Sequence, residues 1–376
     1  MRILLLAEEF YPSVSGGART RWEFCTGAVT AGHDVTAFTP QRDDLPDSEI
    51  IKGVRIERPA SLRLPGTDGL SSTSTMSRLL LSPLFFFATL WTLHRSDIDP
   101  DVIVSTSNSM HWMAWVLQRL LGVKATNFIG YSPIVHPDRH SHVRLLLAKA
   151  NIRLFHAELI LCRSHSVKSY VQSATDCNVR IVHGIVDGEL IRDTAASSQT
   201  KHREELSVPS DGCVLAFVGR LVPIKRPLAT LEILTELDDD FHLVIVGDGP
   251  LRDAIQRAVV ERGLENRVTL TGEVPPAKAL QYIACADGLV VTSEAESYCS
   301  VALEALALGR PVFTTPVGVL NQITHPNLHS DTLNNLAKTI RKTSMNCSLH
   351  VDTDIVSRYS MTRFTDDFLA ELSRYV

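Results

Sequence analysis

The chain has 376 residues, of which 44% are hydrophobic and 21% charged, and its 37 Lys and Arg against 42 Asp and Glu give a net charge of −5. This length predicts two globular domains, because one domain usually takes about 100 to 200 residues. The composition excludes a disordered chain and a coiled coil, and the lack of a long basic block argues against a nucleic-acid partner.

The first element is predicted at the start of the chain, where "MRILLLAEEF" has one basic residue and a short apolar run. We interpret it as a strand rather than a secretion signal. The seven cysteines are scattered without a CxxC pair, which argues against a disulfide framework and a structural zinc site. The cysteine pattern therefore predicts a cytoplasmic protein.

The first half alternates short runs rich in Val, Ile and Leu with helical stretches; the runs are "RILLLA", "DVTAFTP", "DVIVST", "KATNFIG", "ELILCRS" and "VRIVHG". The second half repeats the scheme with "VLAFVGR", "FHLVIVGDG", "RVTLTGEV", "DGLVVTSE" and "PVFTTP". Continuous apolar runs are typical of parallel strands covered on both faces. The predicted fold class is α/β, with two Rossmann-like doubly wound domains that face each other across a cleft.

The most apolar segment, Leu79 to Leu93, is too short to span a membrane and contains Pro83. We interpret it as a buried helix of the first domain. The alternative is an interfacial element with Trp91, Arg78 and Arg95 near a headgroup layer, which predicts peripheral contact with the cytoplasmic face of a membrane.

Domain boundaries are predicted from a polar stretch, residues 190–212, which has no strand pattern and suits a linker. We assign residues 1–190 to an N-terminal acceptor domain and residues 191–359 to a C-terminal donor domain. The last helix, 360–376, carries Phe364, Phe368 and Leu372 at spacings of four. This stripe predicts that the helix packs back on the first domain.

Two adjacent glycines, Gly16 and Gly17 in "YPSVSGGARTRW", precede a helical stretch after the first strand. Small residues there let backbone N–H groups approach a phosphate, although a plain strand-to-helix turn also fits. "VIVGDGPLRD" places Gly247 after a later strand, and by itself we interpret this turn as structural.

Three cations follow the first strand of the second domain in "FVGRLVPIKRP", where Gly219 makes the turn and Arg220, Lys225 and Arg226 share one loop. Neighbouring cations at the carboxyl edge of a sheet predict an anion such as a diphosphate. The alternative is a solvated basic loop.

Two carboxylates, Glu296 and Glu304, flank the start of a short apolar helix in "EAESYCSVALEALALGRPV". Ser300 is the predicted N-cap and Gly309 the predicted C′ residue. Acids beside free helix N–H groups suit a ligand with both hydroxyls and phosphates, although Glu304 could instead make a side-chain pair along the helix.

Together these segments resemble the group 1 (family 4) glycosyltransferases, which are retaining, nucleotide-sugar-dependent enzymes of the GT-B fold. The likeness extends to "AGHDVTAFTP", "IVHGIVD", "RVTLTGEVP" and "VALEALALGRPV" and covers nearly the whole chain. It implies that Glu296 contacts the donor sugar, Glu304 the ribose hydroxyls, and Arg220 and Lys225 the diphosphate. The resemblance thus implies Glu296, Arg220 and Lys225 as catalytic residues, and Gly16, Gly17, Gly219, Gly247, Ser297, Tyr298, Cys299, Ser300 and Glu304 as donor-binding residues.

The chain departs from the family at two places. Between the two acids the family has glycine, an aromatic residue and glycine, whereas this chain has Ser297, Tyr298 and Cys299. The family also carries a histidine after the fifth N-terminal strand; "KATNFIGYS" has none, and His136 is the candidate acceptor-site substitute, although a surface or core histidine fits it better.

The expected function is transfer of a sugar from a nucleotide diphosphate sugar to a sugar or lipid-linked acceptor hydroxyl, with retention of anomeric configuration, in glycan or cell-envelope synthesis. Fixed cations and helix-end amides stabilise the leaving diphosphate, so we expect neither a metal nor a cofactor. The acid triplets "DID", "DPD" and "DDD" are interpreted as turns. Two alternatives stay open, a nucleotide-sugar epimerase and a non-catalytic nucleotide-sugar-binding or partner subunit.

Overall fold

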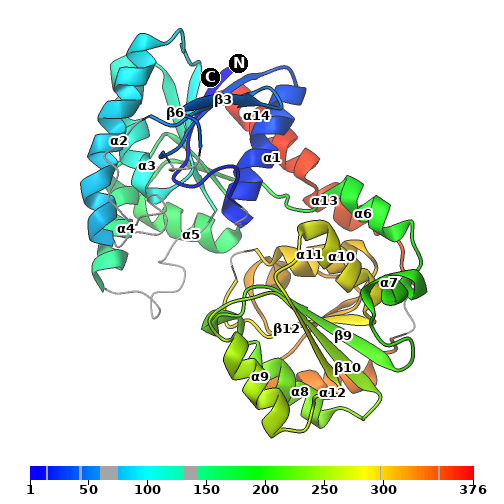
Figure 1. The fold of residues 1–376 in the computed structure, drawn as a ribbon. Coiled ribbons are helices and arrows are strands. Elements are labelled where there is room, and N and C mark those ends of the chain that lie inside the picture. Colours follow the sequence, from blue (N-terminus) through cyan, green and yellow to red (C-terminus); the bar gives the residue numbers. More distant parts are fainter. Residues whose placement is uncertain (14–15, 42–44, 60–74, 131–141, 297, 346–347) are drawn as a thin grey trace. The chain divides into compact units, whose positions relative to one another are not determined.

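The computed structural model describes residues 1–13, 16–41, 45–59, 75–130, 142–296, 298–345 and 348–376. They form two compact units, unit 1 with Met1–His183 and Met361–Val376, and unit 2 with Gly184–Ser360. Each unit holds a mostly parallel sheet between helices, so the predicted Rossmann-like α/β class is confirmed for both (Figure 1).

Unit 1 has, among its described residues, an eight-stranded sheet in the order β3-β4-β2-β1-β5-β6-β7-β8, and only the β3–β4 pair is antiparallel. The strands are β1 (Arg2–Leu6), β2 (Asp34–Phe38), β3 (Ser48–Ile51), β4 (Val54–Glu57), β5 (Val102–Ser105), β6 (Lys124–Ile129), β7 (Leu159–Cys162) and β8 (Asn178–Ile181). The helices are α1 (Gly16–Thr30), α2 (Thr75–Arg95), α3 (Asn108–Leu121), α4 (His142–Leu154), α5 (His165–Ala174) and the returning α14 (Met361–Tyr375).

The central strand β1 shows why this sheet needs a helix layer on each face. Ile3 and Leu5 pack in one core with residues of α1 and α14, while Leu4 and Leu6 pack in another with residues of α2 and α3. Successive side chains of a strand point to opposite faces, so an unbroken apolar run is buried from both sides.

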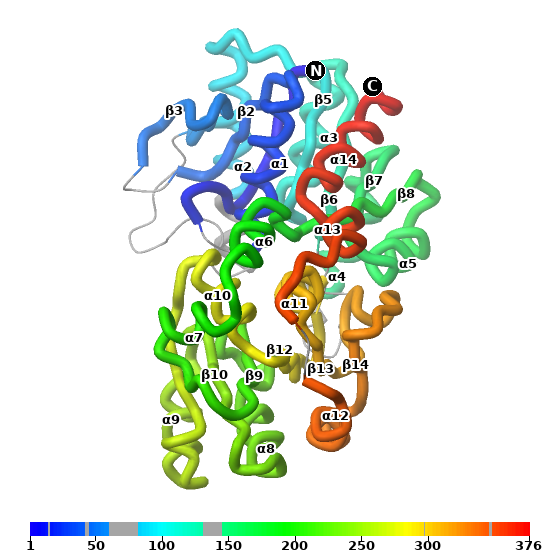
Figure 2. Tube along the Cα trace, turned by 90° about the vertical axis from the view of Figure 1, so that its right-hand side faces the viewer, coloured from blue at the N-terminus to red at the C-terminus, as the bar shows by residue number. Residues whose placement is uncertain are grey.

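The predicted return of the C-terminal helix corresponds to α14, which lies beside α1 (Figure 1 and Figure 2). The rings of Phe24 and Phe368 are 4.4 Å apart, and Phe364 and Leu372 are buried in the same core. The chain therefore enters unit 2 and comes back to complete unit 1.

Helix α2 has a buried face and an exposed one. Phe85 is fully buried, whereas Phe87 and Trp91 are 64% and 58% exposed. The prediction of a buried helix thus holds for one face only. Among the described residues, no helix has both the length and the apolarity that crossing a membrane requires.

Unit 2 has, within its described part, a six-stranded parallel sheet in the order β11-β10-β9-β12-β13-β14. The strands are β9 (Cys213–Val218), β10 (Phe241–Val246), β11 (Val268–Gly272), β12 (Gly288–Val291), β13 (Val312–Thr314) and β14 (Leu328–Ser330). The helices are α6 (Gly188–Ala195), α7 (Gln199–Leu206), α8 (Leu228–Glu236), α9 (Arg252–Glu261), α10 (Pro276–Cys285), α11 (Ser300–Ala307), α12 (Leu336–Lys342) and α13 (Thr353–Tyr359).

The predicted linker, residues 190–212, is wrong as a description of that segment, because it contains most of α6 and all of α7. Ile191 is buried in the core of unit 2, and both helices pack against α10. Unit 2 begins at Gly184, earlier than the predicted boundary, since the Ile185 and Val186 N–H groups donate to the Tyr359 carbonyl at 2.7 and 2.9 Å.

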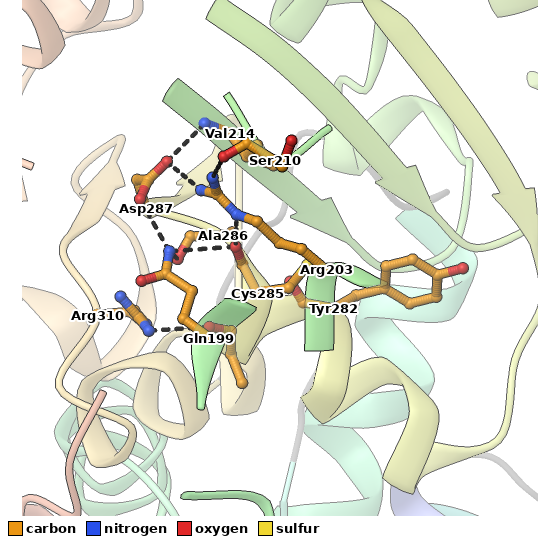
Figure 3. Close-up of polar contacts among 10 residues, drawn as sticks. Gln199, Arg203, Ser210, Val214, Tyr282, Cys285, Ala286, Asp287 and Arg310 are labelled. Atoms are coloured by element: carbon orange, nitrogen blue, oxygen red, sulfur yellow. Dashed lines mark hydrogen bonds and ion pairs between the residues drawn. The ribbon is translucent and has the colours of Figure 1, made fainter. Parts of the chain in front are cut away.

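Helix α7 is held by a buried polar cluster at the amino ends of β9 and β12 (Figure 3). Arg203 Nη2 lies 2.6 Å from Asp287 Oδ2, which also accepts the Val214 N–H at 2.7 Å. Gln199 Nε2 donates to Asp287 Oδ1 at 2.8 Å. These charges are satisfied within the fold, so we assign them a structural role.

Candidate functional site

In the sheet of unit 2, the order in which strands are added reverses between β9 and β12. From β9 the chain proceeds outward through β10 and β11, then returns to pair β12 on the other side of β9. In doubly wound sheets, ligands bind outside the carboxyl ends of the strands at such a switch point. The loops that follow β9 and β12, residues 219–227 and 292–299, are therefore the first place to look.

The path of the first loop is set by close approach to the loop after β10. A Cβ atom on Gly247, whose φ is +138°, would lie 2.0 Å from the Gly219 carbonyl oxygen, so only glycine fits there. The Leu221 N–H donates to the Asp248 carbonyl at 2.8 Å. Arg220, between these anchored positions, is exposed.

The two loops are joined by hydrogen bonds. Thr292 Oγ1 donates to the Lys225 and Arg226 carbonyls, each at 2.9 Å, and the Glu294 N–H donates to the Ile224 carbonyl at 2.9 Å. Arg226 Nε donates to the Thr292 carbonyl at 3.0 Å. Of the three predicted anion-binding cations, Arg226 is thus engaged in holding the loops together, which leaves Lys225 and Arg220 for a ligand.

Lys225 and Glu296 form an ion pair across the switch point, with Lys225 Nζ donating to Glu296 Oε1. Ser293 Oγ donates to the same oxygen at 2.7 Å. The side chains are 24% and 10% exposed, so the pair is accessible at the lysine end. Two predicted site residues, distant in sequence, are therefore in direct contact.

Helix α11 starts differently from the prediction. Ser300 is its first helical residue rather than its N-cap, and the N-cap is Cys299, which adopts a left-handed conformation with φ +60° and makes no side-chain cap. A serine N-cap needs extended backbone, which this turn does not give. The predicted end is present: Gly309 has φ +69°, and the Arg310 N–H donates to the Ala305 carbonyl at 2.8 Å as in a Schellman motif.

The pKa of the Cys299 thiol is affected by both predicted acids. Burial, followed by the negative charge of Glu296, raises the pKa of this thiol to about 12, and Glu304 acts in the same direction. Lys225 has the opposite effect. The thiol is therefore protonated at pH 7, and Lys225, Glu296 and Glu304 all lie close enough to affect its pKa.

Tyr298 was predicted to bind the donor, but its side chain is 4% exposed. Its hydroxyl oxygen accepts the Gly184 N–H at 3.0 Å. The ring is thus packed inside unit 2, and any donor contact at this position falls to the backbone. Ser297 and the acceptor candidate His136 lie outside the described residues.

Gly16 and Gly17 belong to unit 1, where Gly16 is the first residue of α1. A Cβ on Gly17 would lie 3.3 Å from Arg21 Nη1, and that nitrogen donates to the Glu9 carbonyl at 2.9 Å. Gly17 therefore leaves room for Arg21, whose pKa is lowered by burial.

Sequence reasoning missed a polar cluster at the switch point of unit 1, between β1 and β5. Ser109 Oγ donates to Glu8 Oε2 at 3.1 Å, and the Glu8 N–H donates to Ser107 Oγ at 3.4 Å. The sequence could have predicted this cluster from its position, because Glu8 follows the first strand and the two serines follow β5, both at the carboxyl edge of the sheet. Among the described residues of both units, no three His, Cys, Asp or Glu side chains are grouped to hold a metal ion.

With a lysine and a carboxylate paired at the switch point of a doubly wound sheet, unit 2 belongs to the class of α/β proteins whose ligand sites lie at that edge of the sheet. Residues 14–190 match the family described as Glycosyltransferase Family 4, and residues 198–332 match the family described as Glycosyl transferases group 1. The chain belongs to the group 1 glycosyltransferases.

Curated relatives agree with this family. The GDP-mannose-dependent alpha-mannosyltransferase of Mycolicibacterium smegmatis is 27% identical over 326 residues, covering 85% of this chain and 80% of that protein. The D-inositol 3-phosphate glycosyltransferase of Acidothermus cellulolyticus is 32% identical over 155 residues, covering 38% of this chain and 34% of that protein. The chain thus spans only about a third of the length of this second relative.

Solved structures show the same GT-B fold. Sucrose-phosphate synthase from Thermosynechococcus elongatus superposes with a TM-score of 0.76 at 19% identity, covering 98% of this chain and 94% of that one. HepE of Anabaena, in complex with UDP-glucose, gives a TM-score of 0.75 at 16% identity and covers all of both chains. At these identities the likeness concerns the fold.

Proposed function

We propose that this protein transfers a sugar from a nucleoside diphosphate sugar to an acceptor hydroxyl, with retention of anomeric configuration. The observation that carries the proposal is the Lys225–Glu296 pair at the β9–β12 switch point. The alpha-mannosyltransferase relative is named for GDP-mannose, and HepE was solved with UDP-glucose, both donors of this class.

Each residue in this proposal has a chemical task. Lys225 and the exposed Arg220 neutralise the diphosphate, and the N-terminal end of α11, which has no side-chain cap, adds partial positive charge. Glu296 accepts hydrogen bonds from the sugar and Glu304 from the ribose. The side chains supply the positive charge that a divalent metal would otherwise provide, so we propose a reaction without metal or cofactor.

Retention follows in this proposal from attack on the face that the diphosphate leaves. The bond between the anomeric carbon and the diphosphate oxygen breaks, and its electron pair stays on that oxygen. The acceptor oxygen then bonds to the same face of the anomeric carbon, and its proton passes to the leaving phosphate. Lys225 and Arg220 lower the barrier by stabilising the charge that develops on the diphosphate.

The test is to incubate the protein with UDP-glucose, GDP-mannose, ADP-glucose or dTDP-glucose and a membrane lipid extract, and to measure release of the nucleoside diphosphate. We expect one donor to be consumed, and the anomeric C–H coupling of the product to match that of the donor. An inverted product would contradict retention. Donor binding without release would favour the second candidate, a binding subunit, which is supported by the left-handed Cys299 where the resemblance expects glycine.

We further propose that unit 1 contacts an anionic lipid surface and takes a lipid-linked acceptor. Leu84, Phe87 and Trp91 are exposed at spacings of three and four, so they share one face of α2. Arg95 lies over the Trp91 ring at 4.3 Å. An aromatic side chain beside a cation suits the headgroup layer of a membrane.

Charge favours an anionic surface. Helices α2, α3 and α4 contain no Asp or Glu, although the whole chain has a net charge of −5. Helix α3 packs against both of the others. Leu146 and Leu154 of α4 are also exposed, and α4 carries Lys149 and Arg153. The proposal keeps the cytoplasmic location predicted from the cysteines.

A flotation assay tests the lipid contact with vesicles of phosphatidylcholine alone or with 30 mol% phosphatidylglycerol, on the order of a cell's anionic lipid content. We expect flotation only with the anionic vesicles, and its loss in Trp91→Glu. Ile50→Glu is the matched control, because Ile50 is also exposed, at 71%, but lies on β3. Equal flotation of the Trp91→Glu and Ile50→Glu proteins would contradict the proposed surface.

A further inference from the structure

A buried serine contacts the Lys225–Glu296 pair and has no part in the proposed function so far. Ser293 follows β12 and is 1% exposed, and its Oγ donates to Glu296 Oε1 at 2.7 Å. Lys225 Nζ donates to the same oxygen. Within the described part of the chain, Glu296 Oε2 accepts no hydrogen bond. One carboxylate oxygen is therefore bound by the protein, and the other is left for a ligand.

The backbone of Ser293 is anchored from both neighbouring strands. Its carbonyl accepts hydrogen bonds from Arg226 Nη2 at 3.4 Å and from Thr315 Oγ1. Arg226 follows β9 and Thr315 follows β13, and these two strands flank β12 in the sheet. The Thr315 N–H also donates to the Val291 carbonyl at 3.1 Å. The Ser293 hydroxyl is thus a donor on a backbone that is held in place.

Glu296 is confined at the other end of its side chain. A Cβ on Gly318 would lie 3.1 Å from Glu296 Cβ and 3.1 Å from the Glu296 carbonyl oxygen, so this residue packs directly on Gly318. With Cβ enclosed and Oε1 bound, the carboxylate has little freedom to turn. A functional side chain that is held by packing and hydrogen bonds keeps the geometry that its task requires.

The two donors to Oε1 respond differently to a diphosphate. Lys225 carries a positive charge on a flexible stem, so a diphosphate can attract it away from Glu296. Ser293 is neutral and its backbone is anchored. Once Lys225 has turned to the diphosphate, Ser293 is the donor that remains on Oε1 among the described residues.

We propose that Ser293 is a positioning residue, which holds Glu296 Oε1 so that Oε2 faces the donor sugar while Lys225 binds the diphosphate. The inference rests on the proposed function, in which Glu296 contacts the sugar. Ser293 itself touches neither part of the donor. Its loss should therefore weaken binding of the sugar and spare binding of the diphosphate.

A double-mutant cycle in the ligand-free protein tests whether Ser293 holds Glu296. Urea denaturation gives the unfolding equilibrium constant of unit 2 in the wild type, Ser293→Ala, Glu296→Ala and the double variant. We expect Ser293→Ala to raise this constant at least about fivefold in the wild type, the loss expected for one hydrogen bond, and less than about twofold in Glu296→Ala. Equal effects in both backgrounds would overturn the inference.

Calorimetric titration tests the positioning itself. Each protein is titrated with UDP, GDP, ADP and dTDP, and with UDP-glucose, GDP-mannose, ADP-glucose and dTDP-glucose. For the nucleotide that binds, Ser293→Ala should weaken the affinity for the sugar donor at least about fivefold and change the affinity for the free nucleoside diphosphate less than about twofold. Equal weakening of both would show a merely structural serine and would overturn the inference.

Two further variants isolate the hydroxyl. Ser293→Thr keeps it and should restore the ratio of the two affinities, and a folded Ser293→Thr with the ratio of Ser293→Ala would overturn the inference. Thr194→Val is the matched control, because it removes a buried hydroxyl of α6 that donates to the Leu190 carbonyl at 2.7 Å; it should leave the ratio unchanged. If none of the eight ligands binds, the proposed function fails, while the ligand-free cycle still decides whether Ser293 holds Glu296.

Discussion

In the proposed function, two anions compete for Lys225: the Glu296 carboxylate and the diphosphate of the donor. In the ligand-free protein it donates to Glu296, and a donor diphosphate would compete for the same ammonium group. A partly exposed ion pair contributes roughly 1 kcal/mol at most. If Glu296 contacts the sugar as proposed, its carboxylate should therefore weaken binding of a nucleotide that carries no sugar.

Glu296→Gln should bind the free nucleoside diphosphate up to about fivefold more tightly, because it releases Lys225 at a gain of roughly 1 kcal/mol. The same variant should turn over the sugar donor more slowly. Calorimetry with the nucleotide and a product-release assay measure the two effects. Glu304→Gln is the control and should not tighten nucleotide binding. Weaker nucleotide binding by Glu296→Gln would contradict the competition.

His111 predicts a pH dependence of stability in unit 1. It is buried, its Nδ1 lies 2.8 Å from Ser105 Oγ, and burial lowers its pKa from 6.5 to about 3. Between these values the unfolded chain binds a proton that the folded protein does not, so the free energy of unfolding falls as pH falls. Its contribution is constant above pH 6.5.

Between pH 7 and pH 5, protonation of His111 in the unfolded chain lowers the free energy of unfolding by about 2 kcal/mol. The decrease is about 1.4 kcal/mol for each pH unit below 6.5. His111→Gln cannot take up the proton, so its stability deficit relative to wild type should narrow by that amount at pH 5. Urea denaturation at the two pH values measures it. A deficit that is the same at both would show that His111 is not the titrating group.

Much of the site could be predicted from residue type and position. Lys225 and Glu296 stand after strands at the carboxyl edge, and the structure brings them into contact. Arg226 could not be separated from its neighbours, because its role depends on carbonyl groups of a loop 66 residues away in sequence. The sequence could not predict Cys299 as the N-cap of α11 in a left-handed conformation either, because serine is the preferred N-cap residue.

At the scale of elements, the apolar runs predicted the buried parallel strands well. The β3–β4 hairpin was missed; its signal was "KG", with Lys52 and Gly53 both at positive φ between two short strands. Helices α6 and α7 were missed because they are polar on average, and their few apolar residues gain stability only by packing on α10. Helices that depend on tertiary contacts for their stability are therefore the hardest to predict from local sequence.

The loop after β9 depends on the loop after β10 for its shape. Gly247→Ala should destabilise unit 2 by more than about 3 kcal/mol, because its Cβ would lie 2.0 Å from the Gly219 carbonyl oxygen. Gly263→Ala is the matched control, with φ +65° but open space around its Cβ, and should lose only about 1 kcal/mol. Urea denaturation of both variants provides the comparison, and equal losses would contradict the close approach.

On the scale of the whole molecule, the chain leaves unit 1 and returns to it. Helix α14 supplies Phe364 and Phe368 to the core that holds Phe24 and Phe128. The core of unit 1 is therefore incomplete without residues 361–376. The crossing at Gly184 and the return at Ser360 make the stability of unit 1 depend on residues that follow all of unit 2.

Phe368→Ala should destabilise unit 1 by about 3 to 5 kcal/mol, since it empties a buried aromatic position, and should leave unit 2 unchanged. Hydrogen exchange resolved by peptide locates the loss in each unit. Arg363→Ala, which changes an exposed residue of the same helix, should lose less than about 1 kcal/mol. Faster exchange throughout unit 2 would contradict a separate core for each unit.

In the proposed function, unit 2 binds a nucleoside diphosphate sugar at the loops after β9 and β12. Calorimetric titration with UDP-, GDP-, ADP- and dTDP-sugars tests it most directly, using wild type, Lys225→Ala and the exposed-lysine control Lys201→Ala. We predict that one donor binds, and that Lys225→Ala loses about 1.5 to 3 kcal/mol of its binding free energy while Lys201→Ala loses none. Equal affinity of all three proteins for the bound donor would contradict the claim, and binding of none of the four would do so as well.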